Sequence, residues 1–199
     1  MAVAVAGVLV AAGAVTYSVA GDGGPGAEVP VAGSADAGFA RDMAVHHQQA
    51  VEMSYIVRDR TTDVEVRRLA YDIAQTQANQ RGMLLGWLDL WGLPKVSADG
   101  PMGWMDMAGM SGGKDGALMP GMATDTELKK LGTLNGRAAE VFYLRLMTAH
   151  HKGGIHMAEA CVHKCTVDVE KRLAQGMVDA QQSEIGLMAD LLKARGAKP

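Results

Sequence analysis

Two pairs of adjacent histidines, each flanked by methionine, are the residues of this 199-residue chain best suited to chemistry. The stretch DMAVHHQQAVEM spans residues 42–53, and LMTAHHKGGIHM spans residues 146–157. Neutral imidazole binds copper, zinc, iron or nickel, whereas thioether sulfur selects Cu(I) and is a poor ligand for magnesium or calcium. The combination predicts a copper site. Its expected ligands are His46, His47, His150, His151, Met43, Met53, Met147 and Met157.

The two stretches belong to an internal repeat with a constant offset of 104 residues. The offset relates the histidine pairs and their methionines, and it continues to the RLA triplets at 68–70 and 172–174. Further along, it relates Gln77 to Gln181 and Gln80 to Glu184. A constant offset through separate segments indicates a duplicated unit, here a helical hairpin.

Capping signals divide each copy into helices. Ser34 is expected to cap a helix ending near Asp59, and Thr62 with Glu65 forms a capping box for a second helix that Gly92 and Pro94 close. In the second copy, a capping box at 124–127 opens a short helix and GTLNG at 132–136 breaks it. A long helix to about His163 and a last helix from Thr166 to near Gly196 follow.

The expected architecture is all-α. Hairpins at 35–93 and 124–196, joined by a loop at 94–123, bury their apolar faces most simply as an antiparallel four-helix bundle over residues 35–196. Aromatic residues make up only 5%, and β-strand patterns are missing. The net charge of −3, without a run of Lys or Arg, argues against nucleic-acid binding.

Helical periodicity of about 100° per residue sorts the side chains by face. Both histidine pairs fall beside the inward stripe, whereas His156 and His163 point outward. The expected inward stripe of the last helix is Leu173, Met177, Ala180, Glu184, Leu187 and Leu191. Glu184, Gln80, Gln77 and Gln181 can then support metal-bound imidazoles by hydrogen bonding. Alternatively, the same His/Glu/Gln network only specifies how the helices pack.

The segment Pro101–Met122 contains six methionines, at positions 102, 105, 107, 110, 119 and 122. Its glycines and prolines exclude a regular helix, so these side chains are not ordinary filler of a helical core. Two interpretations remain open. The segment collects Cu(I) through several thioethers, or it is an apolar flap over the open end of the bundle, with Trp104 shielding either arrangement.

Cys161 and Cys165 are the only cysteines. A disulfide is the first expectation in an oxidising compartment. Because two cysteines four residues apart in a regular helix are poorly oriented for one, the helix would have to end between them. The alternative is a pair of thiols that, with His163 between them, binds a soft metal.

The first 20 residues carry no charged side chain, and this length suits a bilayer-spanning helix. We expect a membrane anchor or a signal peptide cleaved after Ala20, either of which places the remainder outside the cytoplasm. A buried soluble helix is the less favoured alternative. Residues 21–34, rich in glycine, would form a flexible linker.

The doubled HH motif, with Gln181, Glu184 and Ile185 downstream and the Met-rich segment between the copies, resembles the family called domain of unknown function 305. The resemblance covers residues 38–196 and implies a ferritin-like bundle in a bacterial extracytoplasmic protein associated with copper. Gln80 replaces the Glu of a strict repeat, which favours one asymmetric site over two equal ones.

Enzyme activity is the less favoured class. Di-iron bundles use Glu-x-x-His motifs, and none of the eight glutamates here has a histidine three residues later. No nucleophile with a positioned base is recognisable either. The sequence therefore favours copper buffering or delivery, with a structural or protein-interaction bundle as the alternative.

Overall fold

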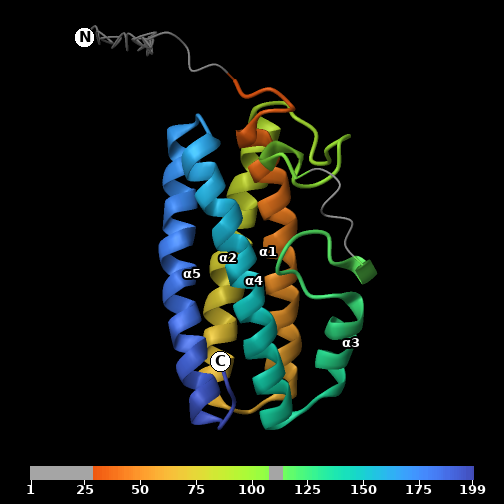
Figure 1. The fold of residues 1–199 in the computed structure, drawn as a ribbon, viewed down its shortest axis with the longest axis vertical. Coiled ribbons are helices and arrows are strands. Elements are labelled where there is room, and N and C mark those ends of the chain that lie inside the picture. Colours follow the sequence, from red (N-terminus) through yellow and green to blue (C-terminus); the bar gives the residue numbers. More distant parts are fainter. Residues whose placement is uncertain (1–28, 108–113) are drawn as a thin grey trace, which may run out of the picture.

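Four long helices lie side by side in the computed structural model, which describes residues 29–107 and 114–199 (Figure 1). They are α1 (Ala35–Arg60), α2 (Val64–Leu90), α4 (Gly136–Lys164) and α5 (Asp168–Ala194). Helices α1 and α5 run in one direction, and α2 and α4 run in the other. The most extensive packing joins α1 to α2 and α4 to α5, and α1 also packs on α4. The all-α prediction is confirmed for the described residues, whereas the ferritin-like assignment and the duplication stay predictions.

Capping groups set several helix ends where the sequence predicts them. Ser34 Oγ accepts a backbone N–H at 3.2 Å at the start of α1. Thr124 and Glu127 form the predicted capping box of the short helix α3 (Asp125–Thr133). At the end of α2, Gly92 has a φ of +67°, which is a left-handed conformation that glycine adopts without steric cost.

Two helix starts differ from the prediction. Asp63, not Thr62, caps α2, and its carboxylate accepts two backbone N–H groups at 2.9 and 3.1 Å. Helix α5 follows Val167 rather than Thr166. The N–H and hydroxyl of Thr166 instead donate to the carboxylate of Asp36 on α1, at 2.8 and 3.2 Å.

The buried face of α5 is also rotated from the predicted stripe. Ala180 and Leu187, expected inside, are exposed, while Gln181 and Met188 are buried in their place. Glu184 lies at the edge of the core, with 23% of its side chain exposed. The inward carboxylate predicted for Glu184 therefore reaches the interior from the rim of the bundle.

Two apolar clusters fill the bundle, one at each end. The first surrounds the start of α1 and includes Met43 and Met157. The second surrounds the end of α1 and includes Met53 and Met147. Along both α1 and α4, the histidine pair lies between a residue of one cluster and a residue of the other. The histidines therefore form a polar layer between two apolar regions.

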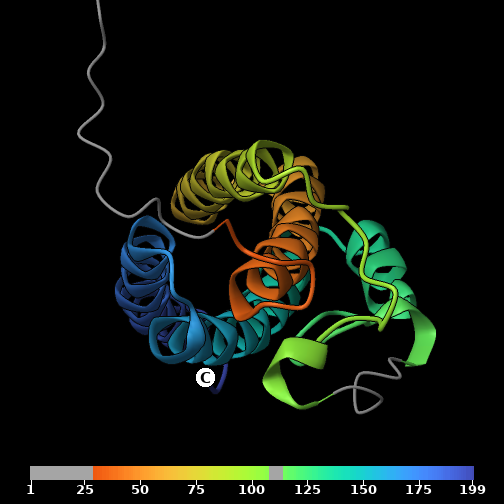
Figure 2. The same ribbon diagram turned by 90° about the horizontal axis from the view of Figure 1, so that it is seen from above.

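The Met-rich segment and α3 lie outside α1 and α4 (Figure 2). Asp42 Oδ2 accepts the Met102 N–H at 2.7 Å, and the Gln49 side chain exchanges two hydrogen bonds with the backbone of Ala123. Only two short 3₁₀ turns, Gly103–Met105 and Lys114–Gly116, occur between α2 and α3 in the described part of the chain. The described part of the segment therefore lies against α1, and its interpretation as a flap over the open end stays a prediction.

The predicted anchor or signal peptide at residues 1–20 lies outside the described residues, as do Met110 and most of the predicted linker. Residues 29–34 of that linker are not helical. Within residues 29–107 and 114–199, none of the helices combines the length and the apolar character needed to span a membrane.

Candidate metal centre

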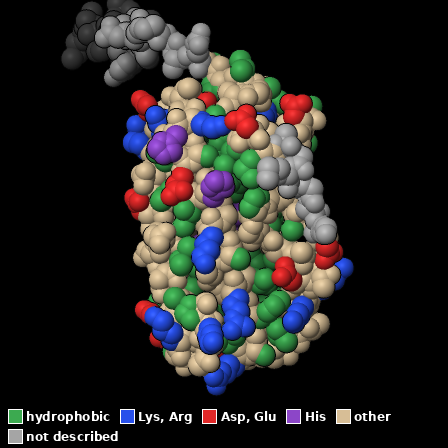
Figure 3. Space-filling view, in the orientation of Figure 1, with side chains coloured by type: hydrophobic (Ala, Val, Ile, Leu, Met, Phe, Trp, Pro, Cys, Tyr) green, Lys and Arg blue, Asp and Glu red, His purple; other side chains and the backbone are tan. Residues whose placement is uncertain are grey.

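The histidine layer consists of His46 and His47 on α1 and His150 and His151 on α4, and all four residues are 0% exposed. The histidine side chains visible on the surface in Figure 3 therefore do not belong to this layer. His156 and His163 are exposed, as the helical periodicity predicts. The fold brings the two predicted pairs together in the protein interior and leaves the other two histidines outside.

The rings of His46 and His150 stack across the interface of α1 and α4. Their centroids lie 3.6 Å apart with an interplanar angle of 28°. Within each pair the rings are farther apart, at 6.5 Å for His46 and His47 and 6.4 Å for His150 and His151. Gly154 makes the close approach possible, because a Cβ at this position would lie 3.1 Å from His46 Cε1.

Hydrogen bonds fix which nitrogen of two rings carries the proton. His150 Nε2 lies 3.0 Å from the His46 carbonyl oxygen, and His151 Nε2 lies 2.6 Å from Glu184 Oε2. A carbonyl oxygen and a carboxylate can only accept, so in each neutral ring Nε2–H donates. The lone pair of each neutral ring is then on Nδ1, the atom left free for a metal.

His47 repeats the arrangement of His151, with an amide in place of the carboxylate. His47 Nε2 lies 2.9 Å from Gln80 Oε1, and the two partners are 33 residues apart, as are His151 and Glu184. The predicted roles of Gln80 and Glu184 as partners of the histidines agree with these contacts.

The nitrogens that remain are buried without a hydrogen-bond partner in the described protein. Nδ1 is unpaired in all four histidines, and Nε2 of His46 is unpaired as well. Leaving a buried polar atom unpaired costs about 1–3 kcal/mol. Gln77 and Gln181, also buried, each have an unpaired Oε1. So many unpaired acceptors and donors in one layer are unusual for a core whose only task is packing.

Burial keeps the imidazoles of His46, His47 and His150 uncharged at neutral pH. Desolvation, with a smaller contribution from the neighbouring histidines, lowers the pKa of His46 and of His150 well below the usual 6.5. Desolvation also lowers the pKa of His47 to about 3, against the opposing effect of its hydrogen bond with Gln80. Neutral imidazole is the form that binds metal ions, so no proton has to be removed from these rings first.

Buried thioethers flank the layer on both sides. Met43 and Met157 belong to the apolar cluster on one side, and Met53 and Met147 belong to the cluster on the other. Each of the four is at most 1% exposed. The predicted soft donors therefore border the predicted imidazole donors in a region closed to solvent.

The four imidazoles do not converge on a single point in this conformation. Among the described residues, only Cys161, Cys165 and Glu170 form a group of at least three His, Cys, Asp or Glu ligand atoms within 4.8 Å of one another. An ion in the histidine layer would therefore need thioether ligands beside one or two imidazoles, or a rotation of the rings.

Methionines of the Met-rich segment split between two environments. Met102 and Met119 are buried in the apolar cluster around the start of α1, and Met105, Met107 and Met122 are partly buried against it. Trp104 packs edge-on against Phe39 with centroids 5.9 Å apart. These contacts support the apolar-cover interpretation for the two buried methionines.

Sequence reasoning did not identify two features of this region. Helical periodicity placed Gly154 on the inward face but did not predict that His46 and Gln181 lie close to it. A Cβ there would come within 2.5 Å of Gln181 Oε1. Sequence reasoning also did not identify Glu170, a fully buried acidic residue in the first turn of α5.

The fold and the buried layer define an all-helical bundle with a candidate centre for a soft metal. The chain belongs to the family described as domain of unknown function DUF305, whose model matches residues 36–192. No functionally curated protein matches the sequence significantly.

Solved structures show the same fold. A DUF305 protein from Streptomyces coelicolor, predicted to be secreted, is 73% identical, with a TM-score of 0.79 over 84% of this chain and 98% of that one. A DUF305 fragment from Deinococcus radiodurans is 29% identical, with a TM-score of 0.66 over 80% of this chain and 96% of that one. CopM in its Cu(I)-bound form is 20% identical, with a TM-score of 0.62 over 80% of this chain and 96% of that one. CopM has also been solved in Cu(II)-bound and silver-bound forms.

Proposed function

We propose that this chain is an extracytoplasmic metal-binding protein that buffers or delivers copper through its histidine layer. The observation that carries the proposal is the set of buried Nδ1 atoms, unpaired in all four rings of the layer. In His150 and His151 the protein uses Nε2–H for its own hydrogen bonds and leaves the metal-binding lone pair free. Met43, Met53, Met147 and Met157 would add the thioethers that favour Cu(I).

Comparison with two similar proteins also supports the proposal. CopM, which shares the fold, binds copper and silver ions. The Streptomyces coelicolor relative, predicted to be secreted, supports a location outside the cytoplasm. There the predicted anchor or cleaved signal at residues 1–20 would either hold the bundle at a membrane or release it.

The competing function is a structural or protein-interaction bundle in which the His/Glu/Gln network only specifies packing. One observation favours it: the histidines already pair with Gln80, Glu184 and a backbone carbonyl without any ion. The two functions differ in their response to metal, because an ion that binds only the folded state stabilises that state by mass action.

The deciding experiment is titration of the chain, with its Cys161–Cys165 disulfide intact, with Cu²⁺ and with Ag⁺. The silver ion is a redox-inert probe for the Cu(I) site. We expect calorimetric binding and a rise in melting temperature. At 100 times Kd, the stabilisation is about 2.7 kcal/mol. Replacing both His46 and His150 with Ala should abolish the shift, while Zn²⁺ and Fe²⁺ serve as metal controls.

The exposed histidines provide the matched control. His156→Ala/His163→Ala removes the same number of imidazoles from the surface of α4. This variant should keep the full copper shift. If it loses the shift, or if the His46/His150 variant keeps it, binding occurs at the surface and the proposal is wrong.

A further inference from the structure

A second group of possible ligands lies at the opposite end of α4 from α3, away from the histidine layer. Cys161 and Cys165 are joined by a disulfide, and the carboxylate of Glu170 has an oxygen within 4.8 Å of both sulfurs. The three residues are 0%, 3% and 0% exposed. We propose that Cys161, Cys165 and Glu170 form a metal site for a thiophilic cation of the Zn²⁺ type. The site can bind the cation only when the disulfide is reduced.

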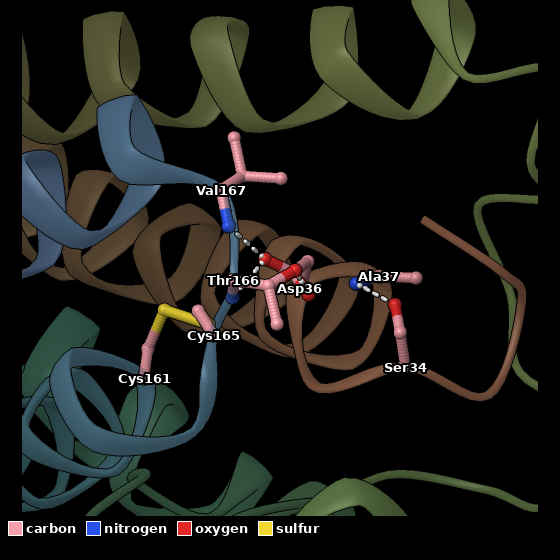
Figure 4. The surroundings of a disulfide bond; sticks show 7 residues. All are labelled: Ser34, Asp36, Ala37, Cys161, Cys165, Thr166 and Val167. Carbon is pink, nitrogen blue, oxygen red and sulfur yellow. Dashed lines mark hydrogen bonds between the residues drawn. A yellow bond between two sulfur atoms is a disulfide. The ribbon is translucent and has the colours of Figure 1, made fainter. Parts of the chain in front are cut away.

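The backbone around the disulfide is held by bonds that do not depend on it. Helix α4 ends at Lys164, and the Cys165 N–H donates to the Cys161 carbonyl at 2.8 Å. The carboxylate of Asp36 accepts the N–H groups of Thr166 and Val167, each at 2.8 Å (Figure 4). Reduction therefore breaks the link between the sulfurs but leaves the turn that carries Cys165 fixed to α1.

In the disulfide form, the group beside the Glu170 carboxyl is another carboxyl, that of Asp36, which supplies no positive charge. Neither of its side-chain oxygens has a hydrogen-bond partner of normal geometry, although the residue is fully buried. Burial first, and then the neighbouring Asp36 carboxylate, raises the pKa of Glu170 to about 9. An isolated carboxyl group in the interior is costly unless it is paired or bound to a metal. The Asp36 oxygens already accept hydrogen bonds from the turn, so Asp36 is not counted as a ligand.

The chemistry balances with a dithiol as the reductant. The dithiol gives two electrons to the Cys161–Cys165 bond and becomes a disulfide, and the protein gains two thiols. Zn²⁺ then displaces the two thiol protons and the Glu170 proton and binds two sulfurs and one oxygen. Zinc accepts this donor set in tetrahedral sites, with water in the fourth position. The proposal does not depend on copper binding by the histidine layer.

The test compares the full chain in its disulfide form with the chain reduced by a phosphine, which is removed before titration. Calorimetry should show one additional equivalent of Zn²⁺ in the reduced form. Co²⁺ should give a sulfur-to-metal charge-transfer band in the reduced form only. Equal uptake in both forms, or a reduced form without that band, would overturn the proposal.

Variants assign the ligands. Cys161→Ser/Cys165→Ser should lose the band, and Glu170→Gln should weaken Zn²⁺ binding at least about tenfold, the loss seen even for residues that only support a ligand. His163→Ala is the matched control, since His163 lies between the cysteines in sequence but is exposed, and it should bind Zn²⁺ normally. Unchanged affinity in Glu170→Gln would exclude the carboxylate as a ligand.

If reduction unfolds the chain, Zn²⁺ must restore its helical circular dichroism signal. A failure to do so would contradict the proposed site.

Discussion

At the scale of single residues, the partner of each imidazole decides which nitrogen a metal can reach. Glu184 holds His151 through an Nε2–H bond of 2.6 Å and makes the ring a stronger ligand, because a carboxylate partner raises the basicity of imidazole. Glu184→Gln keeps the shape and removes the charge. We expect copper affinity to fall about 10- to 100-fold, measured by competition with a chelator.

The control for this variant is Ser183→Ala, at the exposed neighbouring position. It should bind copper like the unmodified chain. Both variants should keep the helical circular dichroism signal. Unchanged copper affinity in Glu184→Gln would mean that His151 is not a ligand.

Gly154 tests how tightly the layer is packed. A Cβ at this position would lie 2.5 Å from Gln181 Oε1 and 3.1 Å from His46 Cε1, whereas nothing lies within 4 Å of a Cβ at Gly186. Gly→Ala in a helix normally stabilises by up to about 1 kcal/mol. We expect that gain for Gly186→Ala, and a loss of about 1–3 kcal/mol from overpacking for Gly154→Ala. Urea unfolding measures both, and equal effects at the two positions would show that the layer has room to adjust.

At the scale of elements, one buried polar network joins the four long helices at the end of the bundle opposite the disulfide. Arg195, just after α5, contacts Glu140 on α4 at 2.6 Å and Asp63, the cap of α2, at 2.8 Å. The hydroxyl of Thr61, at the end of α1, donates to Glu140 at 2.5 Å. Arg195 and Glu140 are at most 8% exposed. The network therefore fixes both hairpin ends to each other.

Removing one partner from this network should be costly because the other charge stays buried. Glu140→Ala leaves the Arg195 guanidinium with Asp63 as its remaining ion-pair partner and should lower the free energy of unfolding by about 3–5 kcal/mol. Asp190→Ala breaks the exposed pair with Lys193 and is the matched control. It should change stability little, since exposed ion pairs contribute little. Similar unfolding midpoints in urea for the two variants would contradict this role of the network.

The helices could be predicted from the sequence more reliably than their first residues. Apolar periodicity, capping residues and glycine located each α-helix of the described residues, but Thr62 and Thr166 were wrong as starts. In each case contacts between distant parts of the chain accompany the observed start: Asp63 also contacts Arg195, and Thr166 bonds to Asp36. The pattern of residues within one helix carries no information about these contacts with other helices. For the same reason it misplaced the inward face of α5, where Gln181 is buried and Leu187 is exposed.

The candidate site was predictable in its members but not in its geometry. The HH motif repeated at an offset of 104 residues identified the imidazoles, and the same offset identified Gln80 and Glu184 as partners of histidines. That these partners belong to His47 and His151 was not predicted. Periodicity places a side chain on a face of a helix and gives no distance across a bundle. The stacking of His46 on His150, and the absence of a common centre for the four rings, depend on how closely α1 and α4 approach at Gly154.

At the scale of the whole molecule, a polar layer between two apolar clusters makes folding depend on pH. In the unfolded chain each histidine takes up a proton below pH 6.5, but burial keeps His46, His47 and His150 neutral in the folded chain at much lower pH. These residues have folded pKa values below their unfolded values, so their contribution is complete above pH 6.5 and is lost as the pH falls. For His47 the loss continues to about pH 3.

Urea unfolding of the chelator-treated protein between pH 7 and pH 5, a range above most carboxylate titrations, measures this dependence. Below pH 6.5 each of these histidines should lower the free energy of unfolding by up to about 1.4 kcal/mol per pH unit, because the unfolded state binds one more proton than the folded state. His47→Gln should make the slope shallower, since glutamine does not titrate. His156→Ala/His163→Ala removes only exposed rings and should leave the slope unchanged. Glu170, whose folded pKa of about 9 lies above its unfolded value, contributes a slope of the opposite sign to both proteins, so the difference between His47→Gln and the unmodified chain carries the test. Equal slopes in these two proteins would mean that His47 takes up a proton in the folded state, and a site open to protons would no longer be the closed, neutral environment that copper binding by these imidazoles requires.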